Sequence, residues 1–215
     1  MKKDRAGDAI NKEVVKKCIQ VFVDMGLIKP KPMKTPQGIF LWQGDRNLSI
    51  YDDHFEREFL TSTQKESQQS GMLWHSNRNC PEYLNEVKNM LENEEANADY
   101  WLQPETKTKM LKIVEMELIT KMAEAISSKD SGCVYMFEQK NLNELKLLYD
   151  IFKRDQNTFG LIIQKMNPYI LDRGQKIVMD ENNVKDPHLF TEKLLEFKAE
   201  IDELVNFSFA NQMMF

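Results

Sequence analysis

The chain has no apolar run of the ~20 residues that a membrane-spanning helix needs. Its N-terminus is charged and lacks the apolar segment of a signal peptide. We therefore expect neither membrane insertion nor secretion.

Cysteine is scarce, with three residues at Cys18, Cys80 and Cys133. Their number is odd, their spacing is wide, and no CxxC pair occurs. This pattern favours reduced thiols in the cytosol or nucleus over a disulfide framework. Of the three, Cys133 lies in an apolar setting and is expected to be a small buried side chain.

An excess of positive charge is also missing, because the 215 residues carry a formal charge of -5. Nucleic-acid binding proteins use a basic surface to displace counterions from phosphates. The one short basic cluster, Lys29, Lys31 and Lys34, lies in a proline-rich connector. Nucleic-acid binding is therefore not predicted.

Local motifs for catalysis and metal binding are absent as well. His54, His75 and His188 are scattered, and there is no HExxH, GxSxG, GxGxxG or phosphate-binding glycine loop. His54 stands beside two aspartates, but neighbours one and two apart on a helix point in different directions, so a solvated face is expected. We predict no catalytic, cofactor-binding or metal-binding residue, and no cofactor.

Glycine is scarce, at 8 residues, and this favours helices, because a glycine inside a helix costs about 1 kcal/mol relative to alanine. The clearest helical signal lies at residues 51–60, where apolar side chains fall at positions i, i+4, i+8 and i+9. Tyr51, Phe55, Phe59 and Leu60 are therefore predicted to form one buried face. The two aspartates after Tyr51 suit the positive end of the helix dipole.

The same reasoning predicts about seven helices along the chain. Gly71 is a candidate breakpoint, Pro168 is expected to kink its helix, and Asn141 and Asp186 are expected to cap theirs. The predicted helices cover residues 5–25, 51–74, 81–102, 104–122, 142–152, 159–170 and 187–209.

Residues 29–47 are different, because Pro30, Pro32 and Pro36 are accompanied by two glycines. Proline removes a backbone donor and disfavours a helix. The apolar segment 39–42 is expected to dock on the protein surface. A short hairpin and a partner-binding segment are the alternatives.

An ordered set of motifs resembles the cullins, the scaffolds of multisubunit ubiquitin ligases. The pattern Tyr-x-x-x-Phe-Glu-x-x-Phe-Leu at 51–60 is similar to the long helix of the second cullin repeat. Residues 111–119, with a Glu-x-x-Leu-Ile character, and residues 143–152 are similar to helices of the third repeat. Residues 194–198, with Ser-Phe-x-Asn at 208–211, resemble its last helix.

The resemblance covers nearly the whole chain, with departures. The connector before Tyr51 is longer than cullins usually have, and Lys65-Glu66-Ser67 stands where cullins often carry two aromatics. The predicted organisation is a partial second repeat at 1–102 with the connector 29–47, a third repeat at 103–209, and the start of a link at 210–215. The chain is thus expected to be a fragment of a larger scaffold.

The resemblance implies an all-α fold, an elongated solenoid of cullin-repeat helix bundles. It implies a non-catalytic scaffold arm that spaces a substrate adaptor from the RING-box end of a ubiquitin ligase, in the cytoplasm and nucleus. The implied partners are a BTB-fold or Skp-type adaptor and a RING-box protein, both bound through regions outside this chain. The alternatives are a helical tethering or trafficking subunit unrelated to ubiquitin and, more weakly, an enzyme whose site is assembled from distant residues.

Overall fold

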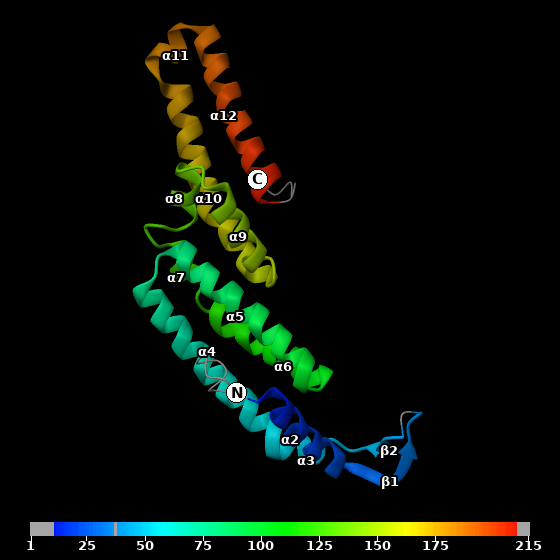
Figure 1. Cartoon of the computed structure of the whole chain (residues 1–215). Helices are drawn as coiled ribbons and strands as arrows, with labels where there is room; N and C mark the ends of the chain where they lie inside the picture. The colour runs from blue at the N-terminus through cyan, green and yellow to red at the C-terminus, as the bar shows by residue number, and fades with distance from the viewer. Residues whose placement is uncertain (1–10, 37, 210–215) are drawn as a thin grey trace. The chain divides into compact units, whose positions relative to one another are not determined.

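The computed structural model describes residues 11–36 and 38–209, and their regular structure is helical except for one hairpin (Figure 1). The all-α class is confirmed, and within the described ranges strands occur only in this hairpin. In chain order the elements are α2 (Lys12–Met25), β1 (Leu27–Lys34), β2 (Phe40–Arg46), α3 (Ser49–Tyr51), the π-helical turn η1 (Asp52–Glu56), α4 (Arg57–Asn77), α5 (Cys80–Trp101), α6 (Pro104–Glu115), the π-helical turn η2 (Met116–Thr120), α7 (Ala123–Ser127), α8 (Cys133–Glu138), α9 (Leu142–Phe152), α10 (Gln156–Met179), α11 (Glu181–Lys185) and α12 (Pro187–Ser208).

The chain divides into two compact units. The first joins the described residues up to Glu66 with Leu91–Ile113, and the second joins Ser67–Met90 with the residues from Val114 onward. Both α4 and α5 contribute residues to each unit. This division differs from the predicted repeat boundary between residues 102 and 103, which stays a prediction.

The elements α3, η1 and α4 follow one another without a gap and form one helical segment, the 49–77 helix. The core of the first unit forms where the start of this helix meets α2, α5 and α6. Phe55 and Leu102 are partly buried and touch both of its clusters. The buried members are Ile19, Val23, Tyr51 and Trp101 in one cluster and Phe59, Ala98 and Met110 in the other.

Helix α2 ends where its sequence predicts, at Gly26, and it begins at Lys12 after the cap residue Asn11. The Asn11 side chain accepts a hydrogen bond from the Val14 amide at the first turn. Gly26 ends the helix, and a Cβ there would lie 1.9 Å from the carbonyl oxygen of Asn47. The Asn47 amide donates to the Gly26 carbonyl at 2.9 Å, so the chain returning from the hairpin lies directly on this glycine. The predicted start of the helix near residue 5 lies outside the described residues.

The proline-rich connector forms an antiparallel hairpin of β1 and β2. The hairpin alternative is thus confirmed, and the favoured expectation of a docked segment was the wrong choice. In Figure 1 the two strands lie beyond the end of α2 and extend away from α2 and α3. Prolines within β1 are compatible with a strand here because β1 has only one neighbouring strand in the described sheet.

In the second unit, α12 packs against α9 and α10, and α10 also packs against α7 and α8. Asp186 caps α12 as predicted, since its side chain accepts from the amides of His188 and Leu189. Asn141 stands at the N-terminus of α9, but its side chain donates to Glu144 instead of accepting a backbone amide, so the predicted cap was wrong.

The predicted break at Gly71 was also wrong, because α4 continues without interruption to Asn77. Helix α10 likewise continues through Pro168 and ends only at Met179. The predicted kink at Pro168 stays a prediction.

Candidate functional site

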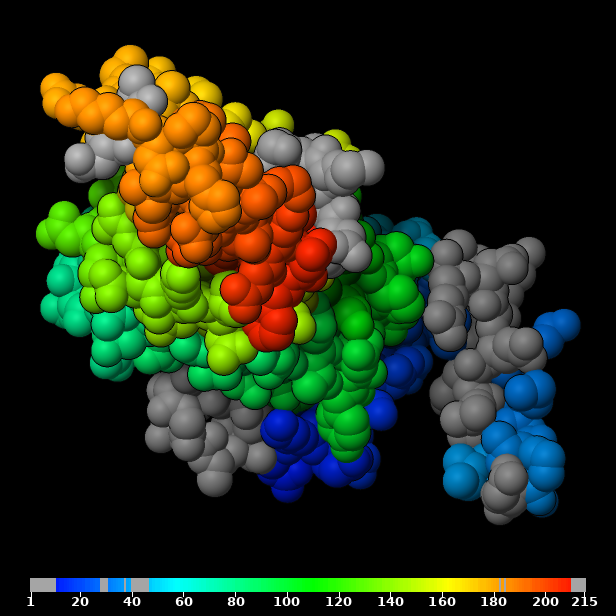
Figure 2. All heavy atoms as spheres, turned by 90° about the horizontal axis from the view of Figure 1, so that it is seen from above, coloured from blue at the N-terminus to red at the C-terminus, as the bar shows by residue number. Residues whose placement is uncertain are grey.

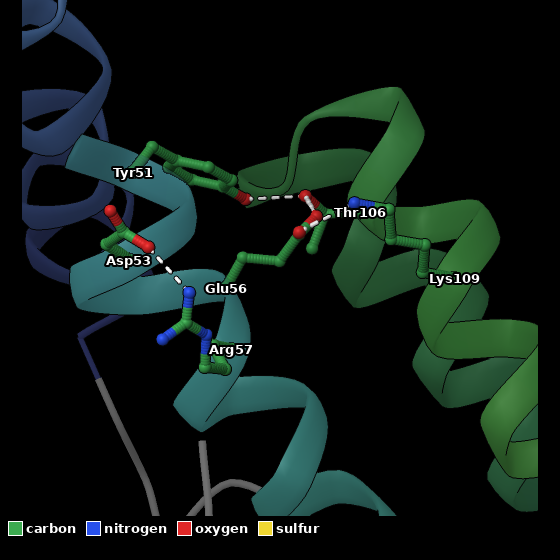
Figure 3. A network of polar contacts seen from close by, with 6 residues as sticks. All are labelled: Tyr51, Asp53, Glu56, Arg57, Thr106 and Lys109. Atoms are coloured by element: carbon green, nitrogen blue, oxygen red, sulfur yellow. Dashed lines mark hydrogen bonds and ion pairs between the residues drawn. The ribbon is translucent and has the colours of Figure 1, made fainter. Parts of the chain in front are cut away.

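A polar network, buried except for its lysine, joins two helical segments of the first unit, and we call its four side chains, Tyr51, Glu56, Thr106 and Lys109, the Glu56 joint (Figure 3). The Tyr51 hydroxyl donates to Thr106 Oγ1 at 3.0 Å, and Thr106 Oγ1 donates to Glu56 Oε1 at 2.7 Å. Lys109 Nζ donates to the other carboxylate oxygen at 2.7 Å. The network ties the start of the 49–77 helix to the first turns of α6.

The π-helical turn η1 explains why a glutamate faces the interior. An ordinary helix repeats its inner face every three to four residues, whereas a π-turn inserts one residue. The inward series therefore steps from Tyr51 to Glu56 and then continues through Phe59, Thr63 and Ser67, all of them buried.

The buried face predicted for residues 51–60 is partly wrong for the same reason. Phe55 and Leu60 are only half-buried, while Glu56 takes an inward position and is 7% exposed. Phe55 still stacks between aromatic neighbours, with ring centroids 5.2 Å from Tyr51 and 5.4 Å from Phe59. The rings of Tyr51, Phe55 and Phe59 therefore pack in a row along the helix, and the Glu56 carboxylate lies on the inner side of that row.

The surroundings of the Glu56 joint keep Tyr51 and Lys109 protonated at neutral pH. Burial raises the pKa of the Tyr51 hydroxyl, which therefore stays protonated and can donate. The hydrogen bond to Glu56 raises the pKa of Lys109, which stays charged. A buried carboxylate is tolerated only when it is paired and hydrogen-bonded, and here both of its oxygens have partners.

A second contact of this kind holds the second unit together, and we call Gly71, Tyr83 and Leu118 the Tyr83 joint. The buried Tyr83 hydroxyl donates to the Leu118 carbonyl at 2.7 Å, a backbone oxygen in the π-turn η2. Burial raises the pKa of Tyr83, so it remains a donor across the physiological range. A Cβ at Gly71 would lie 3.2 Å from Leu118 Cδ2, so glycine allows α4 to approach η2 closely.

The loop before α8 is fastened to the end of α4. Lys129 Nζ donates to the His75 carbonyl at 2.5 Å and to the Arg78 carbonyl at 2.7 Å. A cation at this position complements the negative end of the helix dipole. Ser131 Oγ accepts from the Cys80 amide at 2.9 Å, so the same loop also contacts the start of α5.

Ion pairs also surround Glu200 on α12. Lys140, directly after α8, lies 2.9 Å from Glu200 Oε1, and Arg173 of α10 lies 2.7 Å from Oε2. Burial would raise the pKa of Glu200, but the two cations outweigh it and hold that pKa below its usual range. Ser208 Oγ adds a hydrogen bond to the Leu142 carbonyl at 3.0 Å.

The histidines considered for chemistry in the sequence belong to three different elements, whereas Cys80 and Cys133 lie close enough for their charges to interact. His54 and His188 are exposed, and His75 contributes its backbone carbonyl to the Lys129 contact. Cys133 is fully buried, as predicted, and burial raises its thiol pKa to about 11. Cys80 is also buried, with a pKa raised to about 12 for the same reason. Within residues 11–36 and 38–209, no group of three or more histidine, cysteine, aspartate or glutamate side chains has a metal-binding arrangement.

Sequence reasoning missed the roles of Glu56, Thr106 and Lys109. Glu56 is part of the motif quoted for the long helix, and an α-helical wheel places it between Phe59 and Leu60, but the prediction took only the apolar residues of that face as buried. Thr106 and Lys109 lie in the first turns of α6, where polar residues are ordinary. The one signal of this network in the sequence was a charged residue, Glu56, placed among aromatic residues.

No described helix is both long and apolar enough to traverse a lipid bilayer.

Comparison with known families identifies the architecture. The family model described as the Cullin alpha solenoid domain matches residues 1–215, and the chain therefore belongs to the cullin family.

Curated relatives match the chain at low identity but over most of its length. Cullin-3 of Dictyostelium discoideum is 24% identical over 100% of the chain and 26% of its own length. Cullin-3A of Arabidopsis thaliana is 23% identical over 100% of the chain and 27% of its own length. Cullin-4A of Mus musculus is 28% identical over 79% of the chain and 22% of its own length. The chain thus spans about a quarter of the length of the first curated relatives it matches.

Proposed function

We propose that this chain is part of a rigid, non-catalytic scaffold arm in a cullin-RING ubiquitin ligase. In the whole protein the arm spaces a substrate adaptor, of the BTB-fold or Skp type, from a RING-box protein and the ubiquitin-charged enzyme that it recruits. Both partners bind through regions outside these residues. Its place of action is the cytoplasm and nucleus.

The observation that carries this proposal, together with family membership, is the Glu56 joint. Three hydrogen bonds of 2.7–3.0 Å fix the start of the 49–77 helix to α6 inside the first unit. Side chains held by both packing and hydrogen bonds keep one geometry, whereas an apolar contact alone allows sliding. A chain that must hold two partners at a set separation needs such fixed joints.

The mechanism follows from geometry alone. Holding two reactants at a suitable separation raises their effective concentration, and a tether that cannot span the gap loses this advantage. The described residues therefore have no chemical step of their own to perform, and transfer depends on the stiffness of the arm.

The proposal is tested with the full-length protein, by inserting a flexible Gly-Ser segment between α5 and α6, directly after Leu102. We expect the adaptor and the RING-box protein to co-purify as before, while ubiquitin transfer to a bound substrate slows. The matched control places the same insertion after Gly38, in the turn of the hairpin, where transfer should be unchanged.

Two results would overturn this function. If the full-length protein recovers no RING-box protein, the chain is not a ligase scaffold, and a tethering subunit becomes the better description. If both insertions leave the transfer rate unchanged while the partners bind, the stiffness of these residues has no role in transfer.

A further inference from the structure

The β1–β2 hairpin has no part in the joints described above, and backbone hydrogen bonds join its strands where they meet at the turn. The Thr35 amide donates to the Ile39 carbonyl at 2.8 Å, and the Gly38 amide donates to the Thr35 carbonyl at 2.9 Å. Gly38 has a φ of 80°, in the left-handed region. A left-handed glycine is common where the two strands of a hairpin join, because glycine adopts this conformation without steric cost. The turn fixes the register of the two strands.

The register shows which backbone groups face outward. In antiparallel pairs, residues alternate between exchanging hydrogen bonds with the opposite strand and directing their backbone groups away from it. Counting from the closing pair Thr35–Ile39, the pair Met33–Leu41 bonds across the hairpin. The pair Pro32–Trp42 then has its backbone groups directed outward.

The two outer edges of the hairpin are therefore unequal. On β1, Pro32 stands at an outward position and has no N–H to offer, so a regular strand cannot pair there. On β2, Phe40 and Trp42 stand at outward positions, and β2 contains no proline. No third strand pairs with β2 in the part of the chain that the structure describes.

The hairpin also differs in charge from the rest of the chain. Residues 27–46 contain four basic residues and one acidic residue, a formal charge of +3 in a chain whose total is -5. Lys31 and Lys34 are exposed. In Figure 2 the coloured atoms of the hairpin lie to one side of the darker blue atoms of α2.

We propose that the outer edge of β2 binds an acidic, extended segment of a partner protein, which adds to the hairpin as a third strand. Main-chain hydrogen bonds to the outward backbone groups of Phe40 and Trp42 would supply the part of the affinity that does not depend on the sequence of the partner segment. The lysines would select acidic segments over basic ones. A nucleic acid could satisfy the lysines but not the row of strand donors and acceptors, so a peptide fits both observations. This inference is independent of the proposed scaffold function.

The test selects ligands without assuming a sequence. A random peptide library displayed on phage is selected on the 215-residue chain, with counter-selection against Trp42→Pro. We expect the enriched peptides to be acidic and rich in strand-forming residues. The best of them, synthesised with a fluorescent label, should bind about tenfold or more weakly to Trp42→Pro and to Lys31→Glu, and more weakly at about 0.5 M salt.

Three controls separate an edge effect from unfolding. Trp42→Phe keeps the outward N–H and should keep the binding, and Pro32→Ala changes only the outer edge of β1 and should also keep it. The amide NMR signals of Lys31 and Met33 report whether Trp42→Pro leaves the hairpin paired. If it does not, Phe40→Pro tests the same edge at the other outward position.

Several results would overturn the proposal. Enriched peptides that are basic, or binding that Trp42→Pro and Phe40→Pro both leave unchanged, would exclude strand addition. Tight binding of a single-stranded oligonucleotide that Lys31→Glu weakens and Trp42→Pro does not would assign the hairpin to nucleic acid. A dimer in light scattering that Trp42→Pro dissociates would assign the edge to a second copy of the chain.

Discussion

At the residue scale, Thr106 is the centre of the Glu56 joint, because its hydroxyl accepts from Tyr51 and donates to Glu56. Thr106→Val keeps the shape of the side chain and leaves two buried polar groups short of a partner. We expect the free energy of unfolding to fall by about 1–3 kcal/mol, the cost of such unpaired groups. Urea denaturation followed by circular dichroism measures this change.

The matched control is Thr108→Val on the same helix. Thr108 is exposed, and its hydroxyl donates only to the Pro104 carbonyl. The substitution should change stability by no more than about 0.5 kcal/mol, as surface changes usually do. Equal effects of the two valines would show that the network does not stabilise the fold.

Glu200 gives a prediction about pH. Its pKa is lower in the folded than in the unfolded chain, so its contribution is complete above the unfolded pKa and disappears as pH falls through the folded pKa. Glu200→Gln should therefore cost about 0.5–1 kcal/mol at neutral pH, the range of partly exposed ion pairs.

The difference between Glu200→Gln and the parent chain should shrink as pH falls below about 4, near the usual glutamate pKa. Glu203→Gln, at an exposed position of the same helix, is the control and should show no such pH dependence. Thermal unfolding at a series of pH values follows both variants. A Glu200→Gln effect that stays constant into acid would argue against the ion pairs.

The burial and the contacts of single residues were the features that the sequence predicted least well. The sequence identifies Cys133 as buried and His54 as exposed, since local apolarity and helix position decide both. It does not identify Glu56 as buried, because the partners that make burial tolerable lie about 50 residues further along the chain. Polar residues become a network only through tertiary contact.

At the scale of the helix, Gly71 sets how closely α4 approaches η2. Gly71→Val places branched carbon atoms against Leu118, which is 1% exposed and has little room to move. We expect a loss of about 1–3 kcal/mol, typical of overpacking. The control is Gly160→Val in α10, where a Cβ would meet nothing within 4 Å.

Gly160→Val should be neutral or slightly stabilising, because valine is the better helix former by about 0.3 kcal/mol. Urea denaturation of both variants gives the comparison. A Gly71→Val chain as stable as Gly160→Val would mean that the Tyr83 joint adapts to the larger side chain.

Helices and strands were predicted well from the sequence where the element has one apolar face, and poorly where it has none. The helices α2, α6 and α9 follow from their spacing of buried residues, and Asp186 with Pro187 marks the start of α12. The second half of α4 has a polar sequence with Thr63, Ser67 and Gly71 inward, so small buried side chains replace the expected apolar stripe. The sequence predicted the hairpin only as one of three alternatives, because prolines argue against a central strand but not against an edge strand.

At the scale of the whole molecule, α4 and α5 each contribute to both compact units, so we predict that the units unfold together. Two variants with a single tryptophan test this. The double substitution Trp42→Phe with Trp74→Phe leaves Trp101 in the first unit, and Trp42→Phe with Trp101→Phe leaves Trp74 in the second.

Each variant should show the same urea midpoint by tryptophan fluorescence and by far-ultraviolet circular dichroism, because one cooperative transition gives coincident probes. The comparison is made within each variant, so a change in stability caused by the substitutions does not affect it. A fluorescence midpoint that differs from the circular dichroism midpoint would show that the units unfold separately.

The family was evident in the order of its motifs more than in any one of them. Patterns at residues 51–60, 111–119, 143–152 and 194–198 each fit many helical proteins, and identities of 23–28% to curated cullins leave few positions in common. What remains shared is the sequence of amphipathic helices, which packing requires.

The π-turn η1 has a consequence for how this protein tolerates insertions and deletions. One added residue in a helix rotates everything after it by about 100° relative to everything before it. The turn therefore absorbs one extra residue between α3 and α4, and it lets Tyr51 and Thr63 face the same interior. Deleting the exposed His54 would bring Tyr51 and Glu56 to the i, i+4 spacing of an ordinary α-helix, so the turn should become regular helix and the inner face of α4 should stay inward.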